Sequence, residues 1–274
     1  MSARAAIVAD RLPRIALRRA LAAVALAWVA AAASADAQNI WDDPAFALYR
    51  QGAQALEAKD YGRAADLARQ ATAVYPEHVL AFYLRGQAEL AQSRWDEAAE
   101  ALAKVTALYP AAASAQRDLG VAYQQLGRVD EAARALEAAL AIRPADDDTR
   151  ARLVVLLLGA NQAARAQPHL KELGEGNPRM PDVYLATARA AYESGDLAGA
   201  AVAFEKAAAL RDDGRTWFNL GVVRTRLGNT AGAIEAFEHA AKFPDTKEQA
   251  TKEIQKVRAG AGGPTRSSRP GLPR

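Results

Sequence analysis

The chain has 274 residues, of which 51% are hydrophobic, 24% are charged and 7% are aromatic, with no cysteine and a formal net charge of +3. The absence of cysteine excludes a disulfide framework, thiolate metal sites and a cysteine nucleophile. Few aromatic residues and abundant alanine favour helices over a β-sandwich or barrel, and the length allows one large domain or two ordinary ones.

The first 37 residues have the three-part pattern of a secretory signal peptide. Five arginines come first, the stretch 20–33 carries no charge, and small residues follow in Ala33-Ser34-Ala35 and in Ala35-Asp36-Ala37. The uncharged stretch is shorter than the span of about 20 residues that a membrane helix needs. We therefore expect cleavage between Ala35 and Ala37, no transmembrane segment after it, and a periplasmic protein. Secretion and retention as an uncleaved anchor are the alternatives.

The rest of the chain repeats itself with a period of 34 residues. Pro76, Pro110, Pro144 and Pro178 follow one another at this spacing, and glycines keep it at positions 52, 86 and 120. Self-similarity at a fixed period of this length indicates a repeat architecture.

The repeated residues resemble the tetratricopeptide repeat (TPR) motif W-x2-L-G-x2-Y, A-x3-F, P. One copy consists of Leu119, Gly120, Tyr123, Ala132, Leu136, Ala139 and Pro144. Two more consist of Trp217, Leu220, Gly221, Ala233, Phe237 and Ala240, and of Phe82, Gly86, Ala98, Leu102 and Pro110. The resemblance implies an exported bacterial TPR protein. Its expected fold is an all-α, right-handed α-solenoid of about six helix-turn-helix repeats plus a C-terminal capping helix.

The period divides residues 38–258 into six repeats and a closing helix. The repeats are expected at 45–78, 79–112, 113–146, 147–180, 181–213 and 214–245, and the capping helix at 247–258. In the fourth repeat Val154 replaces the glycine and Pro168 falls inside the second helix, while in the fifth Ala188 and Asp212 replace the glycine and the proline. Residues 259–274 have the composition of a disordered tail.

Catalytic and metal-binding patterns are absent from the sequence. The three histidines, His78, His169 and His239, lack metal-ligand spacing, and there is neither a nucleophile elbow nor a Walker loop. Acidic pairs at 96–97 and 130–131 begin second helices, where negative charge complements the helix dipole. We predict that the protein is not an enzyme and holds no metal or cofactor.

Binding is the predicted function. In TPR proteins the first helices of the repeats line a concave groove, and residues 2, 5, 9 and 12 of each repeat usually face the ligand. This register assigns to the groove Phe46, Tyr49, Tyr83, Gln87, Leu90, Arg117, Val121, Gln124, Leu185, Arg189, Tyr192, Phe218 and Val222. Aromatic residues and arginine are frequent binding anchors. The alternative is that several of these side chains pack against the next helix.

We therefore expect a periplasmic scaffold that binds a protein or an extended peptide of the cell envelope. The alternative is a glycan-binding or polysaccharide-export accessory protein that uses the same aromatic rings as stacking platforms. The carboxylate clamp of chaperone-binding TPR domains is absent, because positions 5 and 9 lack its lysine and asparagine. The sequence leaves the partner's identity and the oligomeric state open.

The net charge has a local origin. Residues 1–37 contribute +3, the tail contributes +3, and residues 38–258 sum to −3. The basic composition therefore comes from the export signal and the tail, and it gives no basis for nucleic-acid binding by the repeats.

Overall fold

The structure is a computed structural model that describes residues 43–174 and 176–260. The predicted signal peptide lies outside the described residues, as does the predicted tail apart from Ala259 and Gly260.

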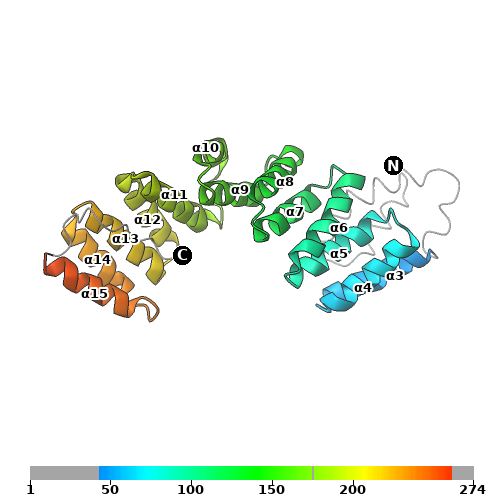
Figure 1. Cartoon of the computed structure of the whole chain (residues 1–274), viewed down its shortest axis with the longest axis horizontal. Coiled ribbons are helices and arrows are strands. Elements are labelled where there is room, and N and C mark those ends of the chain that lie inside the picture. Colours follow the sequence, from blue (N-terminus) through cyan, green and yellow to red (C-terminus); the bar gives the residue numbers. More distant parts are fainter. Residues whose placement is uncertain (1–42, 175, 261–274) are drawn as a thin grey trace. The chain divides into compact units, whose positions relative to one another are not determined.

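The described part of the chain forms thirteen helices and contains no strand (Figure 1). In chain order they are α3 (Pro44–Glu57), α4 (Tyr61–Val74), α5 (Val79–Ala91), α6 (Trp95–Leu108), α7 (Ala113–Gln125), α8 (Val129–Ile142), α9 (Asp147–Gly159), α10 (Ala163–Glu172), α11 (Met180–Ser194), α12 (Leu197–Leu210), α13 (Gly214–Arg226), α14 (Thr230–Ala240) and α15 (Lys247–Arg258). The prediction of an all-α chain of about six helix pairs and a closing helix is confirmed.

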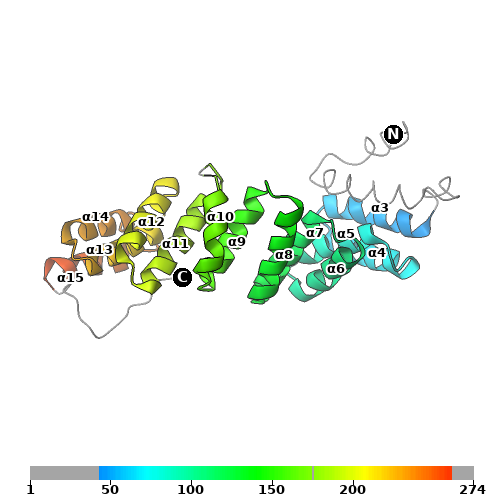
Figure 2. The same ribbon diagram turned by 90° about the horizontal axis from the view of Figure 1, so that it is seen from above.

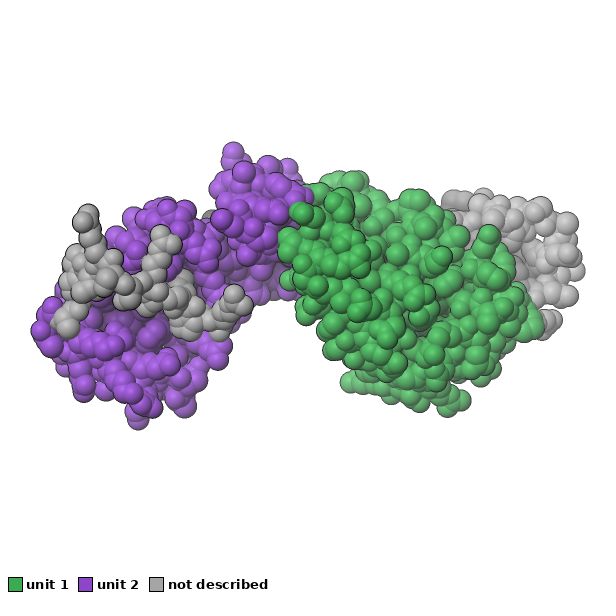
Figure 3. Space-filling view, viewed as in Figure 1, with its two compact units in different colours: residues 1–149 green, residues 150–274 purple. Residues whose placement is uncertain are grey.

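The chain divides after Thr149, inside α9, into two compact units (Figure 3). In unit 1, α3 packs on α4, α5 on α6 and α7 on α8, and each of the first two pairs also packs on the first helix of the next pair. In unit 2, α11 packs on α12 and α13 on α14, with α12 against α13 and α14 against α15. Within each unit the pairs follow one another in chain order (Figure 2).

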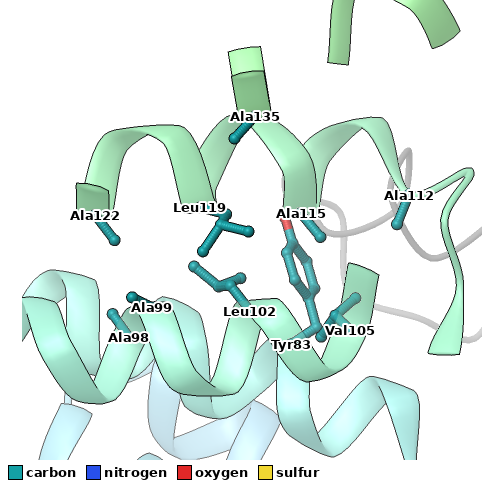
Figure 4. Packing of buried hydrophobic residues seen from close by; sticks show 10 residues of the cluster. All are labelled: Tyr83, Ala98, Ala99, Leu102, Val105, Ala112, Ala115, Leu119, Ala122 and Ala135. Carbon is teal, nitrogen blue, oxygen red and sulfur yellow. The ribbon is translucent and has the colours of Figure 1, made fainter. Parts of the chain in front are cut away.

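Alanine fills much of the core, and a few large side chains fill the spaces that remain. In unit 1, the fully buried Leu102 meets Leu119 between helices, with small alanine side chains around them (Figure 4). The two helices of the third pair pack tightly at the repeated glycine, because a Cβ atom on Gly120 would lie 2.8 Å from Cγ of Leu136. The missing side chain of the glycine therefore permits this contact.

Each helix pair turns through one residue with a left-handed backbone. In the pairs α7–α8 and α13–α14 this residue is Gly127 or Gly228, with φ values of 71° and 74°. Lys59, Ser93 and Asn161 take the same conformation in other pairs, with φ values of 61°, 58° and 58°. Because non-glycine residues rarely adopt this conformation, residue type did not reveal these three turns.

Capping residues and prolines mark the ends of several helices. Asp43 caps α3 by accepting a hydrogen bond at Oδ1 from the Ala45 amide over 2.8 Å, and Pro44 opens the helix. Helices α4, α6 and α8 each end two residues before a period-34 proline. The exception is α10, a helix of 10 residues that contains Pro168 and ends well before Pro178.

Helix α15 closes unit 2. Val257 is buried and Ile254 packs against the cluster that contains Phe237, while lysines and glutamates cover the other side. A polar outer face is what a helix at the end of a repeat stack needs for solubility. In the described residues, no helix has the length and apolar character to cross a bilayer.

Candidate partner-binding surface

All the residues predicted for the groove lie on first helices, as the repeat register requires. Eight are on α3, α5 and α7 of unit 1, and five are on α11 and α13 of unit 2. They divide by exposure into three buried tyrosines and ten half-buried side chains.

Tyr49 belongs to the interior of unit 1. It is 4% exposed, and its ring centroid lies 5.8 Å from that of Phe46 and 5.6 Å from that of His78. Burial raises the pKa of the Tyr49 phenol above its ordinary value, so the hydroxyl stays protonated. Tyr49 therefore packs α3 against the start of the second repeat.

Tyr83 ties two first helices together. It is 6% exposed, and its hydroxyl donates a hydrogen bond to Oδ2 of Asp118 on α7 over 3.0 Å. The other carboxylate oxygen, Oδ1, accepts bonds from Nε and Nη2 of Arg117 over 3.1 and 3.0 Å. Burial, and then the neighbouring carboxylate, raise the pKa of the Tyr83 phenol.

Sequence reasoning missed Asp118, which completes this network. The sequence does contain a sign of this role. Asp118 places a carboxylate at the first-helix position where the second and sixth repeats carry the uncharged Leu84 and Asn219. A charged residue at a position that faces a neighbouring helix needs a partner there.

Tyr192 is the buried tyrosine of unit 2. It is 9% exposed and packs in the cluster that contains Phe204 and Leu220, and the Arg226 guanidinium lies 4.7 Å from its ring centroid. The structure thus corrects the expectation that the three tyrosines present their rings at the surface. It gives no support to Tyr49 and Tyr83 as platforms for stacking sugars.

The half-buried positions of unit 1 combine apolar side chains with polar groups. They are Phe46, Gln87, Leu90, Arg117, Val121 and Gln124. The Oε1 atoms of Gln87 and Gln124 are shielded from water and accept no hydrogen bond from the described residues. An oxygen that water cannot reach is out of reach of a docking ligand as well, so the amide Nε2 is the group through which either side chain could meet a ligand.

In unit 2 the half-buried positions are Leu185, Arg189, Phe218 and Val222. Phe218 meets the buried Phe237 edge to face, with ring centroids 5.4 Å apart, so one side of its ring is already used in packing. Leu185 and Val222 lie against the same core cluster as Tyr192. This surface is therefore mainly apolar, with Arg189 as its cation.

No constellation for metal chemistry occurs in the described residues, since no three histidine or carboxylate side chains come together there. His78 caps α5, and the His239 ring stacks on Trp217 with centroids 4.3 Å apart. The acidic pairs at 96–97 and 130–131 lie in the first turns of α6 and α8, as predicted. These residues have structural roles in this fold.

Family models of the tetratricopeptide repeat match residues 49–109, 83–147, 123–190 and 214–244. Together the matches cover more than half of the chain, on the same helix pairs that the structure shows. The chain belongs to the tetratricopeptide repeat family. No curated protein matches its sequence.

Several solved structures share the fold. YrrB, described as a TPR protein with an unusual peptide-binding site, has a TM-score of 0.56 and 19% sequence identity. The alignment covers 70% of this chain and 99% of the YrrB chain. PilW, described as a widely conserved type IV pilus biogenesis factor, has a TM-score of 0.58 and 19% sequence identity, and the alignment covers 78% of this chain and 98% of the PilW chain. A chain of the APC/C hetero-tetramer Cut9–Hcn1 has a TM-score of 0.53 and 14% sequence identity, and the alignment covers 80% of this chain and 44% of that one.

Proposed function

We propose that this protein is an exported scaffold that binds a protein or extended peptide of the bacterial cell envelope along its first helices. The observation that carries the proposal is the set of half-buried apolar, amide and arginine side chains on α5 and α7 of a TPR fold. TPR proteins generally serve as scaffolds rather than catalysts, and we propose no reaction for this one.

The chemistry of these side chains suits a polypeptide ligand. Val121 and Leu90 offer apolar contact, and the half-buried amide side chains of Gln87 and Gln124 can hydrogen-bond to peptide groups through their Nε2 atoms. Arg117 is held in place by Asp118 and offers charge to an acidic side chain or a carboxyl terminus. YrrB, whose description names a peptide-binding site, supports the same class of ligand.

Site-specific photo-crosslinking in living cells tests this proposal. A crosslinking amino acid at Val121 or Val222, which are half-buried on first helices, should trap a discrete envelope protein. The control position is Glu97, exposed in the first turn of α6, where the same chemistry should trap nothing comparable. If Glu97 gives the same products as Val121, or if Val121 and Val222 trap no protein, the proposal is wrong.

Export is proposed from the pattern of residues 1–37 alone. Cell fractionation should find the protein in the periplasm, and amino-terminal sequencing should find a chain that begins between Asp36 and Gln38. A full-length chain in the cytoplasm would contradict this part of the proposal and leave the binding part untouched.

A further inference from the structure

Helix α13 of unit 2 carries three arginines and no acidic residue. Two of the arginines are engaged within the fold. Arg224 bonds to Glu205 over 2.9 Å. Arg215 lies 3.6 Å from the carboxylate of Asp245. The third, Arg226, is exposed, and its side chain forms neither an ion pair nor a hydrogen bond within the described residues.

Arg226 is held against an aromatic ring. Its guanidinium carbon lies 4.7 Å from the ring centroid of Tyr192 on α11, and Tyr192 is itself 9% exposed and packed in a core cluster. The contact engages the charge of the guanidinium, but it uses none of the N–H donors in a conventional hydrogen bond. The fixed ring therefore restricts the position of the cation and leaves its donors to water or to a ligand.

The surface around this cation is apolar. Leu185 and Val222 are half-buried and pack on the cluster that contains Tyr192. Phe218, also half-buried, precedes Val222 by four residues, and Arg226 follows it by four. This spacing keeps the three side chains on one side of α13. A cation with unused donors thus lies at the end of an apolar strip.

The charges of unit 2 favour an acidic ligand for this surface. Residues 150–258 carry 16 basic and 13 acidic side chains, whereas residues 38–149 carry 11 basic and 17 acidic ones. Arg189, half-buried on α11, adds a second cation. The acidic residues of α11 are Asp182 and Glu193. Asp182 bonds to Arg211 over 2.8 Å, so Glu193 is the acidic side chain of α11 that would oppose such a ligand.

We propose that the first helices of unit 2 bind a peptide segment in which a carboxylate is flanked by apolar side chains, and that Arg226 anchors the carboxylate. This inference rests on the proposed function and specifies its ligand. A guanidinium can donate two parallel hydrogen bonds to one carboxylate, which fixes direction as well as attraction. The apolar neighbours of the carboxylate then cover Val222 and Phe218. A polysaccharide suits this surface less well, because its hydroxyl groups would lose water there without finding partners.

Selection from a displayed library of random peptides of about 12 residues tests the class of ligand, with the purified chain beginning at Gln38 as the immobilised target. The recovered peptides should contain Asp or Glu next to apolar residues more often than the unselected library does. Recovered peptides without this enrichment would overturn the inference and leave peptide binding intact. A selection that recovers no binding peptide would count against the proposed function and the inference together.

Two charge reversals locate the carboxylate. Arg226→Glu should weaken the binding of a recovered acidic peptide by about tenfold or more in fluorescence anisotropy, because it sets like charges against each other. Lys206→Glu is the matched control and should leave the affinity unchanged. Lys206 is also exposed, lies 5.3 Å from the ring centroid of Tyr184 and forms no ion pair within the described residues, but it belongs to α12, a second helix.

A third substitution should strengthen binding. Glu193→Gln removes the exposed carboxylate that follows Tyr192, and it should tighten binding of the acidic peptide by about two- to fivefold, the effect of one exposed charge. Circular dichroism confirms that each variant is folded. An affinity that Arg226→Glu leaves unchanged, or equal weakening by Arg226→Glu and Lys206→Glu, would overturn the inference, because the carboxylate would then have no specific contact with Arg226.

Discussion

At the scale of single residues, the hydrogen bond of Tyr83 is one of a few polar contacts in the interior of unit 1. The hydrogen bond from Tyr83 to Asp118 joins two first helices that are 35 residues apart in sequence, and Arg117 balances the charge. A buried hydrogen bond of this kind forms in only one relative position of the two helices, whereas contacts between alanine side chains are compatible with several positions. Tyr83 therefore helps to set the stacking of the second repeat on the third.

Tyr83→Phe should lower the free energy of unfolding by about 1.5–3 kcal/mol, the range for hydrogen bonds to charged groups, because Asp118 loses a donor in a buried site. Urea denaturation measures the change. Tyr123→Phe is the control, since Tyr123 is half-exposed and packs under Arg128. Equal effects of the two substitutions would show that the bond to Asp118 has no special weight.

His78 makes the start of α5 sensitive to acid. Its Nδ1 accepts a hydrogen bond from the Ala81 amide over 3.3 Å, and only a neutral imidazole can do so. Burial lowers the pKa of His78, and the nearby charge of Asp43 offsets this in part. Tyr49 and Tyr75 are the other titratable groups in contact with the ring.

Because the folded-state pKa of His78 lies below its unfolded value of about 6.5, its contribution to stability is complete above that pH and is lost as the pH falls toward the lowered pKa. His78→Asn keeps a capping side chain that does not titrate. Between about pH 7.5 and 5.5, the unmodified protein should lose up to about 1.4 kcal/mol per pH unit relative to the variant in urea unfolding. A difference that does not change with pH would refute this.

At the scale of elements, a helix pair depends on one small residue at its crossing. Gly120 holds this place in the third repeat, next to Leu136, and the backbone oxygen of Ala132 would lie 3.2 Å from an added Cβ. The repeats with Val154 or Ala188 at this position show that the close approach is not universal. The spacing of a pair is thus decided by the residues on both of its helices.

Gly120→Ala should destabilise the protein by about 1–3 kcal/mol, because the added methyl group overpacks the crossing. Gly159→Ala is the matched control at the end of α9, where an added Cβ meets nothing within 4 Å. That change should be neutral or stabilising by up to about 1 kcal/mol. Thermal unfolding of both variants gives the comparison, and a stabilised Gly120→Ala would contradict the close packing.

At the scale of the whole molecule, the chain divides into two compact units. The division falls inside α9, in the repeat that lacks the glycine and carries Pro168 in its second helix. In a repeat protein, stability is carried by neighbouring contacts, so damage in one unit stays mostly local.

Leu102→Ala removes a fully buried side chain from unit 1 and should cost about 2–5 kcal/mol there. Hydrogen exchange should accelerate in α5, α6 and α7, while α13 and α14 keep their protection. Phe237→Ala, fully buried in unit 2, should give the opposite pattern. Uniform acceleration along the chain in either variant would show that the two units unfold together.

The sequence by itself determined the helix pairs, because the period of 34, the prolines and the small residues are local signals with direct backbone consequences. It also placed the candidate binding residues on first helices. It did not reveal that Tyr49, Tyr83 and Tyr192 are buried. A position in the repeat specifies the direction in which a side chain leaves its helix, but not how closely the neighbouring helix covers it.

Only the tertiary structure decided what was buried, what was paired and where the chain divides. Asp118 became a hydrogen-bond acceptor because α5 and α7 pack side by side, a contact between distant residues that periodicity does not encode.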